Sequence, residues 1–282
     1  MRQIDIYADG FRFLEAPRWH DGALWCSDMH AGRVYRFDPG TANAEVVAQH
    51  SGHVSGIGWD LQGRLLVVSM VDRRLLRLDV DGTLREFADL SSVSTFHAND
   101  MVVDANGRAY VGNFGFDFLG GEQPRPTVVG SVEPDGRVTV AAEELLFPNG
   151  SAITPDGRTF IVAESMADRL TAFVIATDGS LSDRRVWADT PGVRPDGICL
   201  DAEGCIWVAS PARNEVIRVA EGGEVREQIP MPRRTFAVAL GGADRRTLFV
   251  CIARSSSPTD TESDPGSALA TIRVDVAGVG LP

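Results

Sequence analysis

The sequence has few cysteines and none of the spacings that hold a zinc ion or build a disulfide framework. Only four occur among 282 residues, and no two form a Cys-x-x-Cys pair. Four cysteines do not form a disulfide framework in a chain of this size, so we expect reduced thiols in the core. A hairpin turn could bring Cys199 and Cys205 face to face. The four cysteines are Cys26, Cys199, Cys205 and Cys251.

The sequence also lacks a long hydrophobic run. No segment approaches the ~20 apolar residues that a membrane-spanning helix needs. Residues 1–7 alternate polar and apolar side chains and contain no apolar signal-peptide core. These absences predict a protein with no membrane partner, and we expect a cytoplasmic location.

Positive charge is in short supply. The chain has 27 basic and 39 acidic residues, for a formal net charge of −12. This balance argues against a nucleic-acid partner, which requires a basic surface. The sequence also has no Gly-x-Ser-x-Gly nucleophile elbow, no His-Glu-x-x-His zinc motif and no phosphate-binding loop. The chemistry must therefore come from residues that the fold brings together.

The sequence does contain a unit that recurs six times. Each copy has an apolar residue, a tight polar turn and then a short apolar run rich in residues that favour strands. Successive turns lie roughly 40–50 residues apart, which is the period of a four-stranded propeller blade. The turns are at 20–22, 60–63, 104–107, 154–157, 201–204 and 241–244.

The strand count indicates how the ring of blades closes. The sixth copy lacks a fourth strand, whereas residues 3–7 form a surplus strand ahead of the first copy. If this strand completes the last blade, no sheet edge is left open. We therefore predict an all-β, six-bladed β-propeller of four-stranded antiparallel blades, formed as a single domain by residues 1–282. Two irregular segments, 115–129 and 254–267, interrupt the pattern between second and third strands.

The repeat also aligns polar residues. We call one set of six residues the ring residues. Each lies four positions before the apolar residue of its turn, at the start of the innermost strand. Burying two carboxylates and two amides near the axis is costly unless something compensates them, and a cation does so most simply. Oxygen ligands suit Ca²⁺ first, then Mg²⁺ or Mn²⁺, and Zn²⁺ less. Alternatively, these side chains cap turns. The ring residues are Glu15, Ser55, Asn99, Asn149, Asp196 and Phe236.

Two residues before each ring residue lies a second set, the rim residues, which we expect around the mouth of the tunnel. Both irregular segments should overhang this same face. Phe114, Phe116 and Phe118 then form a pocket wall, or simply anchor their loop. Asp28 and Glu164, at second-strand ends, are expected to be solvated loop acids or, alternatively, to support the site. The rim residues are Phe13, His53, His97, Phe147, Arg194 and Arg234.

The chain contains four short motifs in order. They are Glu15-Ala16-Pro17-Arg18-Trp19, Asn99-Asp100 followed by residues 104–108, Pro148-Asn149-Gly150, and Arg194-Pro195-Asp196-Gly197. These motifs resemble those of the family of gluconolactonase, regucalcin (senescence marker protein) and the luciferin-regenerating enzyme. The resemblance covers essentially the whole chain and implies a six-bladed propeller with one divalent metal near the tunnel mouth.

The resemblance also implies roles for individual residues. By motif match Glu15, Asn149 and Asp196 are the metal ligands, and Asp196 is also the general base. Asn99 lies close to the metal and the substrate, as a catalytic and binding residue. His97 stands where the sugar-lactone members carry an arginine that binds substrate. With Arg194 and Phe116, His97 completes the expected substrate-binding set.

Together these features predict a gluconolactonase-like, metal-dependent hydrolase that opens a sugar lactone or a less polar lactone. Ca²⁺ is the cation we expect first, with Zn²⁺, Mn²⁺, Mg²⁺ and Fe²⁺ open. Two alternatives stand beside this hypothesis. One is phosphotriester or fluorophosphate hydrolysis on the same metal site, and the other is a calcium-binding propeller without enzymatic activity. We expect a monomer or a weak homodimer.

Overall fold

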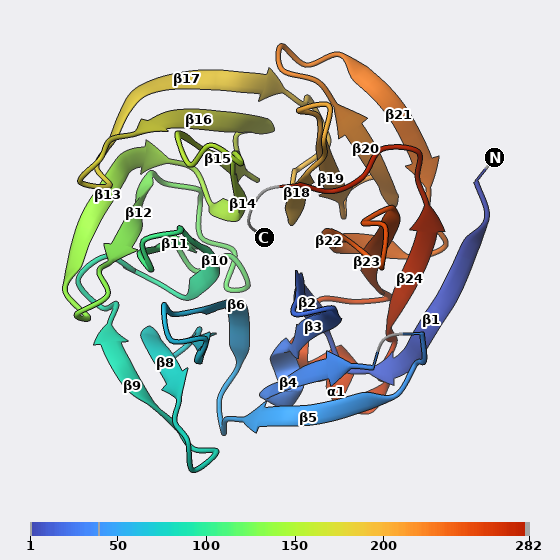
Figure 1. Cartoon of the computed structure of the whole chain (residues 1–282), viewed down its shortest axis with the longest axis horizontal. Helices are drawn as coiled ribbons and strands as arrows, with labels where there is room; N and C mark the ends of the chain where they lie inside the picture. Colours follow the sequence, from blue (N-terminus) through green and yellow to red (C-terminus); the bar gives the residue numbers. More distant parts are fainter. Residues whose placement is uncertain (1, 39, 280–282) are drawn as a thin grey trace.

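The computed structural model describes residues 2–38 and 40–279. These residues form six four-stranded sheets arranged as blades around one axis, as Figure 1 shows. The strands of each blade follow one another from the axis outwards, and neighbouring strands run antiparallel. The predicted all-β, six-bladed propeller is therefore confirmed.

Each blade contains one inner strand and three outer strands. Blade 1 consists of β2 (Leu14–His20), β3 (Ala23–Asp28), β4 (Arg33–Phe37) and β5 (Ala44–Gln49). Blade 2 consists of β6 (Val54–Trp59), β7 (Leu65–Ser69), β8 (Arg74–Leu78) and β9 (Leu84–Asp89). Blade 3 consists of β10 (Ala98–Val103), β11 (Ala109–Asn113), β12 (Thr127–Val132) and β13 (Val138–Leu145). Blade 4 consists of β14 (Pro148–Ile153), β15 (Thr159–Glu164), β16 (Arg169–Ile175) and β17 (Leu181–Asp189). Blade 5 consists of β18 (Ile198–Leu200), β19 (Ile206–Ser210), β20 (Glu215–Val219) and β21 (Val225–Pro230).

The N-terminal strand closes the ring, as the strand count predicts. Blade 6 has the order β22 (Arg234–Gly241), β23 (Thr247–Ala253), β24 (Ser267–Arg273) and β1 (Ile4–Phe11). The outer pair joins the two ends of the chain, with Ile4 opposite Ile272 and Phe11 opposite Ser267. In Figure 1 the blue N-terminal strand lies beside the red C-terminal one. The closing strand continues four residues beyond the predicted end at residue 7.

Three of the six recurring turns fold the same way because the aspartate at their first position binds the backbone. The side chain of Asp60 accepts hydrogen bonds from the N–H groups of Gln62 and Arg64, both at 2.9 Å. Asp104 and Asp201 do the same with the residues two and four positions further on. Such turns offer the backbone a local partner and reverse the chain within four residues. The polar turn residues that define the repeat in the sequence therefore serve to hold the turns in shape.

The inner strands come so close at the axis that most blades have little room for a side chain at one position. The residue after each ring residue is glycine or alanine in five of six blades, Asp100 being the exception. A methyl group added at Gly150 would lie 2.6 Å from the carbonyl oxygen of Asp196. One added at Gly197 would lie 2.6 Å from Ala237. This contact between backbones holds the ring residues of neighbouring blades at fixed positions.

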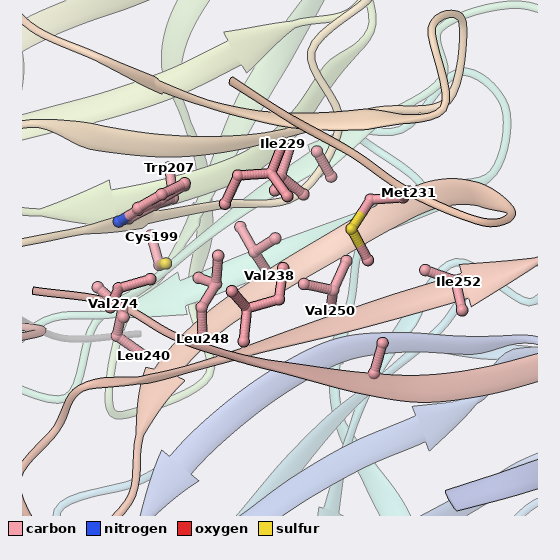
Figure 2. Packing of buried hydrophobic residues seen from close by; sticks show 14 of the residues in the cluster. Cys199, Trp207, Ile229, Met231, Val238, Leu240, Leu248, Val250, Ile252 and Val274 are labelled. Carbon is pink, nitrogen blue, oxygen red and sulfur yellow. The ribbon is translucent and has the colours of Figure 1, made fainter. Parts of the chain in front are cut away.

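The hydrophobic core lies between the blades. Figure 2 shows the layer between blades 5 and 6, in which Cys199, Trp207 and Ile229 face Val238 and Val250. Trp207 is only 1% exposed, so this layer anchors the two blades to each other. All four cysteines are buried and free, which confirms the expectation of reduced core thiols.

The two irregular segments contain more regular structure than predicted. Strand β12 already begins at Thr127, so the first segment ends three residues earlier than expected. The second contains the short helix α1 (Pro258–Ser263), whose first turn is capped by the side chain of Ser257. No helix within residues 2–38 and 40–279 is long and apolar enough to cross a membrane.

The C-terminal segment crosses the end of the tunnel that lies opposite the ring residues. The N–H of Gly278 donates to the carbonyl of Arg245, and that of Val279 donates to the carbonyl of Leu200. The candidate site is therefore approached from the other face.

Candidate functional site

The ring position forms the floor of a cavity of about 300 Å³. Glu15, Asn99, Asn149 and Asp196 all line it, together with Phe236. Ser55, the ring residue of blade 2, does not line the cavity. Its hydroxyl instead donates to Asn99 Oδ1 at 3.4 Å. The fold thus brings together the two carboxylates and two amides that the repeat aligns.

The two carboxyl groups on the floor disfavour each other's ionisation. Burial, followed by the charge of Asp100, raises the pKa of Glu15 to about 8. Burial also raises the pKa of Asp196, and the charges of Glu15 and Asp100 raise it further. Buried like charges of this kind are stabilised when a cation lies between them.

The two amides differ in their partners. Asn149 Nδ2 donates to the hydroxyl of Ser165 at 3.2 Å, and Ser165 donates to the carbonyl of Pro195 at 2.7 Å. Asn99 is 4% exposed, and its Nδ2 has no hydrogen-bond partner among the described residues. A buried amide donor normally has a partner, so Asn99 is poised to donate to a ligand oxygen.

An ion pair that the sequence did not reveal lies within the tunnel. Arg18 of β2 reaches Asp100 of β10, with Nη2 2.6 Å from Oδ1, and both residues are buried. Arg18 also donates to the carbonyl of Met101 at 2.8 Å. Its charge opposes the rise in the pKa of Asp100 that burial causes. The available signal was Asp100 itself, which stands where the other blades carry glycine or alanine.

All six rim residues line the cavity above the ring. Blades 1 to 4 contribute rings, from Phe13, His53, His97 and Phe147, whereas blades 5 and 6 contribute Arg194 and Arg234. The histidines of the rim carry a lowered pKa, chiefly because they are partly buried. They are therefore neutral near pH 7 and add no charge to this side of the cavity.

Two rim residues have a strained backbone. Phe147 has φ 59° and Arg194 has φ 49°, and each precedes a proline. The left-handed region is disfavoured for residues with a side chain, and a following proline restricts the backbone further. Asp168 supports the conformation of Arg194 by accepting its N–H at 2.7 Å. Strain of this kind concentrates at functional sites.

The aromatic wall differs from the prediction at one residue. Phe114 and Phe118 line the cavity, whereas Phe116 does not. Phe116 is 1% exposed and packs behind the wall, with its ring centroid 5.9 Å from that of Phe147 and 6.4 Å from that of Phe118. A substrate in this cavity does not reach it, because the alternation of residues 114, 116 and 118 breaks in a loop.

The sequence reasoning missed His30, which lines the cavity from the short 3-10 helix η1 (Met29–Ala31). Its ring stacks on Phe13 at 4.9 Å, and Nδ1 lies 2.7 Å from the hydroxyl of Thr261 in α1. Burial, followed by the charges of His53 and Arg12, lowers the pKa of His30 to about 4. His30 follows a strand end and belongs to no aligned position, so the repeat did not mark it.

The prediction that Asp28 and Glu164 are solvated loop acids is wrong. Both are buried, at 2% and 0% exposure. Asp28 accepts the N–H groups of Arg12 and Phe13, and Glu164 accepts that of Leu146 at 2.8 Å. Each acid therefore fixes the backbone beside a rim residue of its own blade.

No group of three or more His, Cys, Asp or Glu side chains with metal-binding geometry occurs among residues 2–38 and 40–279. A cation on the cavity floor would therefore rest on two carboxylates and an amide. That set fits a hard divalent ion, because all its donors are oxygen atoms and its two acids repel each other.

Comparison with known proteins identifies the family. The family model described as SMP-30/Gluconolactonase/LRE-like region matches residues 13–254. The chain belongs to this family. The resemblance of the four motifs is thereby confirmed, and so is the expectation of a gluconolactonase-like hydrolase at the level of the family.

Individual relatives of this family member cover almost its whole length. Pentonolactonase XacC of Haloferax volcanii is 31% identical over 283 residues, which are 96% of this chain and 93% of the relative. A 6-deoxy-6-sulfogluconolactonase of Pseudomonas putida is 29% identical over 282 residues, with 95% and 93% covered. A solved structure described as a calcium-binding protein, regucalcin, from Agrobacterium tumefaciens has a TM-score of 0.80 at 22% identity. It covers 97% of this chain and 94% of its own, and shows the shared fold.

Proposed function

We propose that this protein hydrolyses a lactone in the cavity above the ring residues. One observation carries the proposal. Four blades place two mutually repelling carboxyl groups, an oriented amide and an unpartnered amide donor on the floor of one cavity. The names of the lactonase relatives support this reaction class.

A divalent cation held by Glu15, Asn149 and Asp196 is part of the proposal. The hydrogen bond from Asn149 Nδ2 to Ser165 leaves the amide oxygen available as a ligand. Ca²⁺ fits such oxygen donors best, and Mg²⁺, Mn²⁺, Fe²⁺ or Zn²⁺ are the other candidates. When bound, the cation would polarise the lactone carbonyl and acidify a nearby water molecule.

The protein side chains supply the remaining steps. Asn99 Nδ2 donates a hydrogen bond to the lactone carbonyl oxygen, and this bond strengthens as negative charge develops there. Asp196 accepts a proton from the attacking water. His97, at the rim of blade 3, is neutral near pH 7 and donates a hydrogen bond to the alcohol oxygen that leaves as the ring opens. The proton that Asp196 took from the water passes to this oxygen, which leaves as a neutral alcohol group.

The walls of the cavity favour a lactone that is less hydroxylated than a sugar lactone. His97 stands in place of the arginine of sugar-lactone members, and it lies beside Phe114, with ring centroids 5.7 Å apart. Phe114 in turn stacks on Phe147 at 4.3 Å. These side chains offer few hydrogen bonds to a chain of hydroxyl groups, so polar groups on this side would lose their water without replacement.

A screen of lactones and aryl esters with a pH indicator tests the proposal, using protein first chelated and then reloaded with each cation. We expect turnover of at least one lactone, its loss on chelation and its return with a divalent ion. A cation that raises the melting temperature while no ester is hydrolysed would contradict the proposal. That result would instead indicate the non-enzymatic, calcium-binding propeller.

A further inference from the structure

The rim of the cavity has two chemically different sides. Four adjacent blades present aromatic or imidazole rings, and the remaining two present Arg194 and Arg234. The rings form two stretches of wall. In one, the ring centroids of His30 and His53 are 5.1 Å apart, and in the other those of His97 and Phe114 are 5.7 Å apart. A ligand that fits this cavity therefore has an apolar side and, opposite it, a side with groups that bind to the positively charged arginines.

The two arginines have no carboxylate partner of their own. Within residues 2–38 and 40–279, no carboxylate oxygen lies within 4.0 Å of a guanidinium nitrogen of Arg194 or Arg234. Arg234 Nε donates to the carbonyl of Pro211 at 3.3 Å, and its guanidinium lies 5.2 Å from the centre of the Phe236 ring. These contacts fix its position without neutralising its charge.

Backbone strain supports a binding role for Arg194. Its φ of 49° is unfavourable, it precedes Pro195, and the Asp168 carboxylate holds its N–H in place. Arg194 is an exposed residue that nevertheless lines the cavity. A conformation that costs folding energy persists at a rim position only if the surrounding structure enforces it.

The charge of the whole protein makes this side of the rim unusual. The chain carries a formal net charge of −12, so its net charge repels an approaching anion. Two arginines from adjacent blades at the mouth of a cavity provide a local exception. Guanidinium groups are well suited to carboxylate and sulfonate groups, which accept two parallel hydrogen bonds.

We propose that the cavity takes a lactone with an acidic substituent, whose carboxylate or sulfonate is bound by Arg194 and Arg234. The proposal rests on the lactonase function above. In blade 6, where Arg234 and Phe236 both belong to β22, the rim lies two residues from the ring, or about 6–7 Å along the strand. A lactone ring whose carbonyl faces Asn99 therefore directs a substituent on its far side towards the arginines. The apolar edge of the ring then packs against the aromatic wall.

A matched pair of substrates tests the proposal. The first is a γ-lactone with a carboxylate on the ring carbon next to the ring oxygen, and the second is its neutral carboxamide. We expect the wild-type protein to have a KM about 10- to 100-fold lower for the carboxylate. Arg194→Gln and Arg234→Gln should remove this preference, because they should raise KM for the carboxylate far more than KM for the carboxamide.

Two controls separate charge recognition from structural effects. Arg234→Lys keeps the charge and should retain part of the preference. Arg226→Gln removes an exposed arginine of blade 5 that pairs with Glu224 at 2.9 Å, outside the cavity, and should change neither substrate's KM. Equal losses on both substrates in the Arg194 and Arg234 variants, or no preference in the wild type, would overturn the proposal.

Binding of tetrahydrofuran-2-carboxylate, which has no ester bond, separates this proposal from the lactonase function. Calorimetry should detect binding to the wild-type protein that weakens about 10-fold or more in Arg234→Gln. If no lactone is hydrolysed but this anion binds through the arginines, the lactonase function fails and the anion site stands. If lactones are hydrolysed but the anion does not bind, the anion site fails.

Discussion

Replacing Arg18 by methionine should destabilise the protein strongly, although Arg18 is not proposed to touch the substrate. The side chain is buried in the tunnel, 2.6 Å from Asp100, and also donates to the carbonyls of Pro17 and Met101. Methionine preserves much of the apolar stem but leaves the Asp100 carboxylate buried without a cation. Breaking a buried pair in this way costs about 3–5 kcal/mol.

The surroundings of Asp100 place the cost at the upper end of this range. After the change, Asp100 keeps one hydrogen bond, from the N–H of Met101 at 2.8 Å. It also raises the pKa of Glu15 and of Asp196, so an uncompensated charge here affects the whole floor of the cavity. A divalent cation should consequently restore more stability to Arg18→Met than it adds to the wild type.

Urea unfolding followed by tryptophan fluorescence measures the free energy of unfolding of both proteins, first in the presence of a chelator and then with a divalent cation added. Arg18→Met/Asp100→Asn, which removes both charges, should recover most of the lost free energy of unfolding. Arg226→Met, which breaks the exposed pair with Glu224, should change it by about 0.5 kcal/mol or less. A loss below about 1 kcal/mol for Arg18→Met would refute the reasoning, because removing one partner of a buried ion pair should cost about 3–5 kcal/mol.

Three further predictions concern other parts of the structure. The pKa of His30 is lowered to about 4, so the folded protein favours the neutral imidazole. The free energy of unfolding should therefore be highest above pH 6.5, the ordinary pKa of histidine, and should fall by up to about 3 kcal/mol as the pH drops towards 4. The pH dependence of unfolding in His30→Gln should lack this loss. Gly150→Ala should cost about 1–3 kcal/mol in the free energy of unfolding, because the new methyl group meets the backbone of Asp196 at 2.6 Å. Phe116→Ala should cost about 3–5 kcal/mol, whereas Phe118→Ala, 40% exposed at the cavity, should mainly raise KM.

Each of these predictions has a contrasting result. A stability profile of His30→Gln that matches the wild type between pH 4 and 6.5 would show that burial and the charges of His53 and Arg12 do not disfavour the charged imidazole. Gly52→Ala, where the added methyl would meet only side-chain atoms at 3.3 Å or more, is the control for Gly150→Ala and should cost less. If Phe116→Ala unfolds as easily as the wild type does, the ring is not part of the core.

The repeat allowed the fold and the floor of the site to be predicted because it has a single physical cause. Each turn fixes where the innermost strand of a blade ends, so equivalent residues in different blades surround one axis. Counting back four residues from each turn therefore located Glu15 and Asp196 correctly beside one cavity. The same count showed that residues near the N-terminus must close blade 6.

Features that depend on contacts between repeats could not be read this way. His30 belongs to a connection, and its partner Thr261 lies 231 residues away in the chain. The Arg18–Asp100 pair likewise joins two blades across the tunnel. Phe116 turns away from the cavity because a loop, unlike a strand, does not keep alternate side chains on one side. Local patterns carry no information on such pairings.

The central claim is that Asp196 both holds a cation and accepts a proton while a lactone opens. The most direct test measures cation binding by calorimetry and lactone turnover on the same samples of wild-type protein and Asp196→Asn. We predict that, at cation concentrations that saturate both proteins, the variant loses about 10²- to 10⁴-fold in kcat. Full turnover by an Asp196→Asn protein that binds the cation would contradict the account.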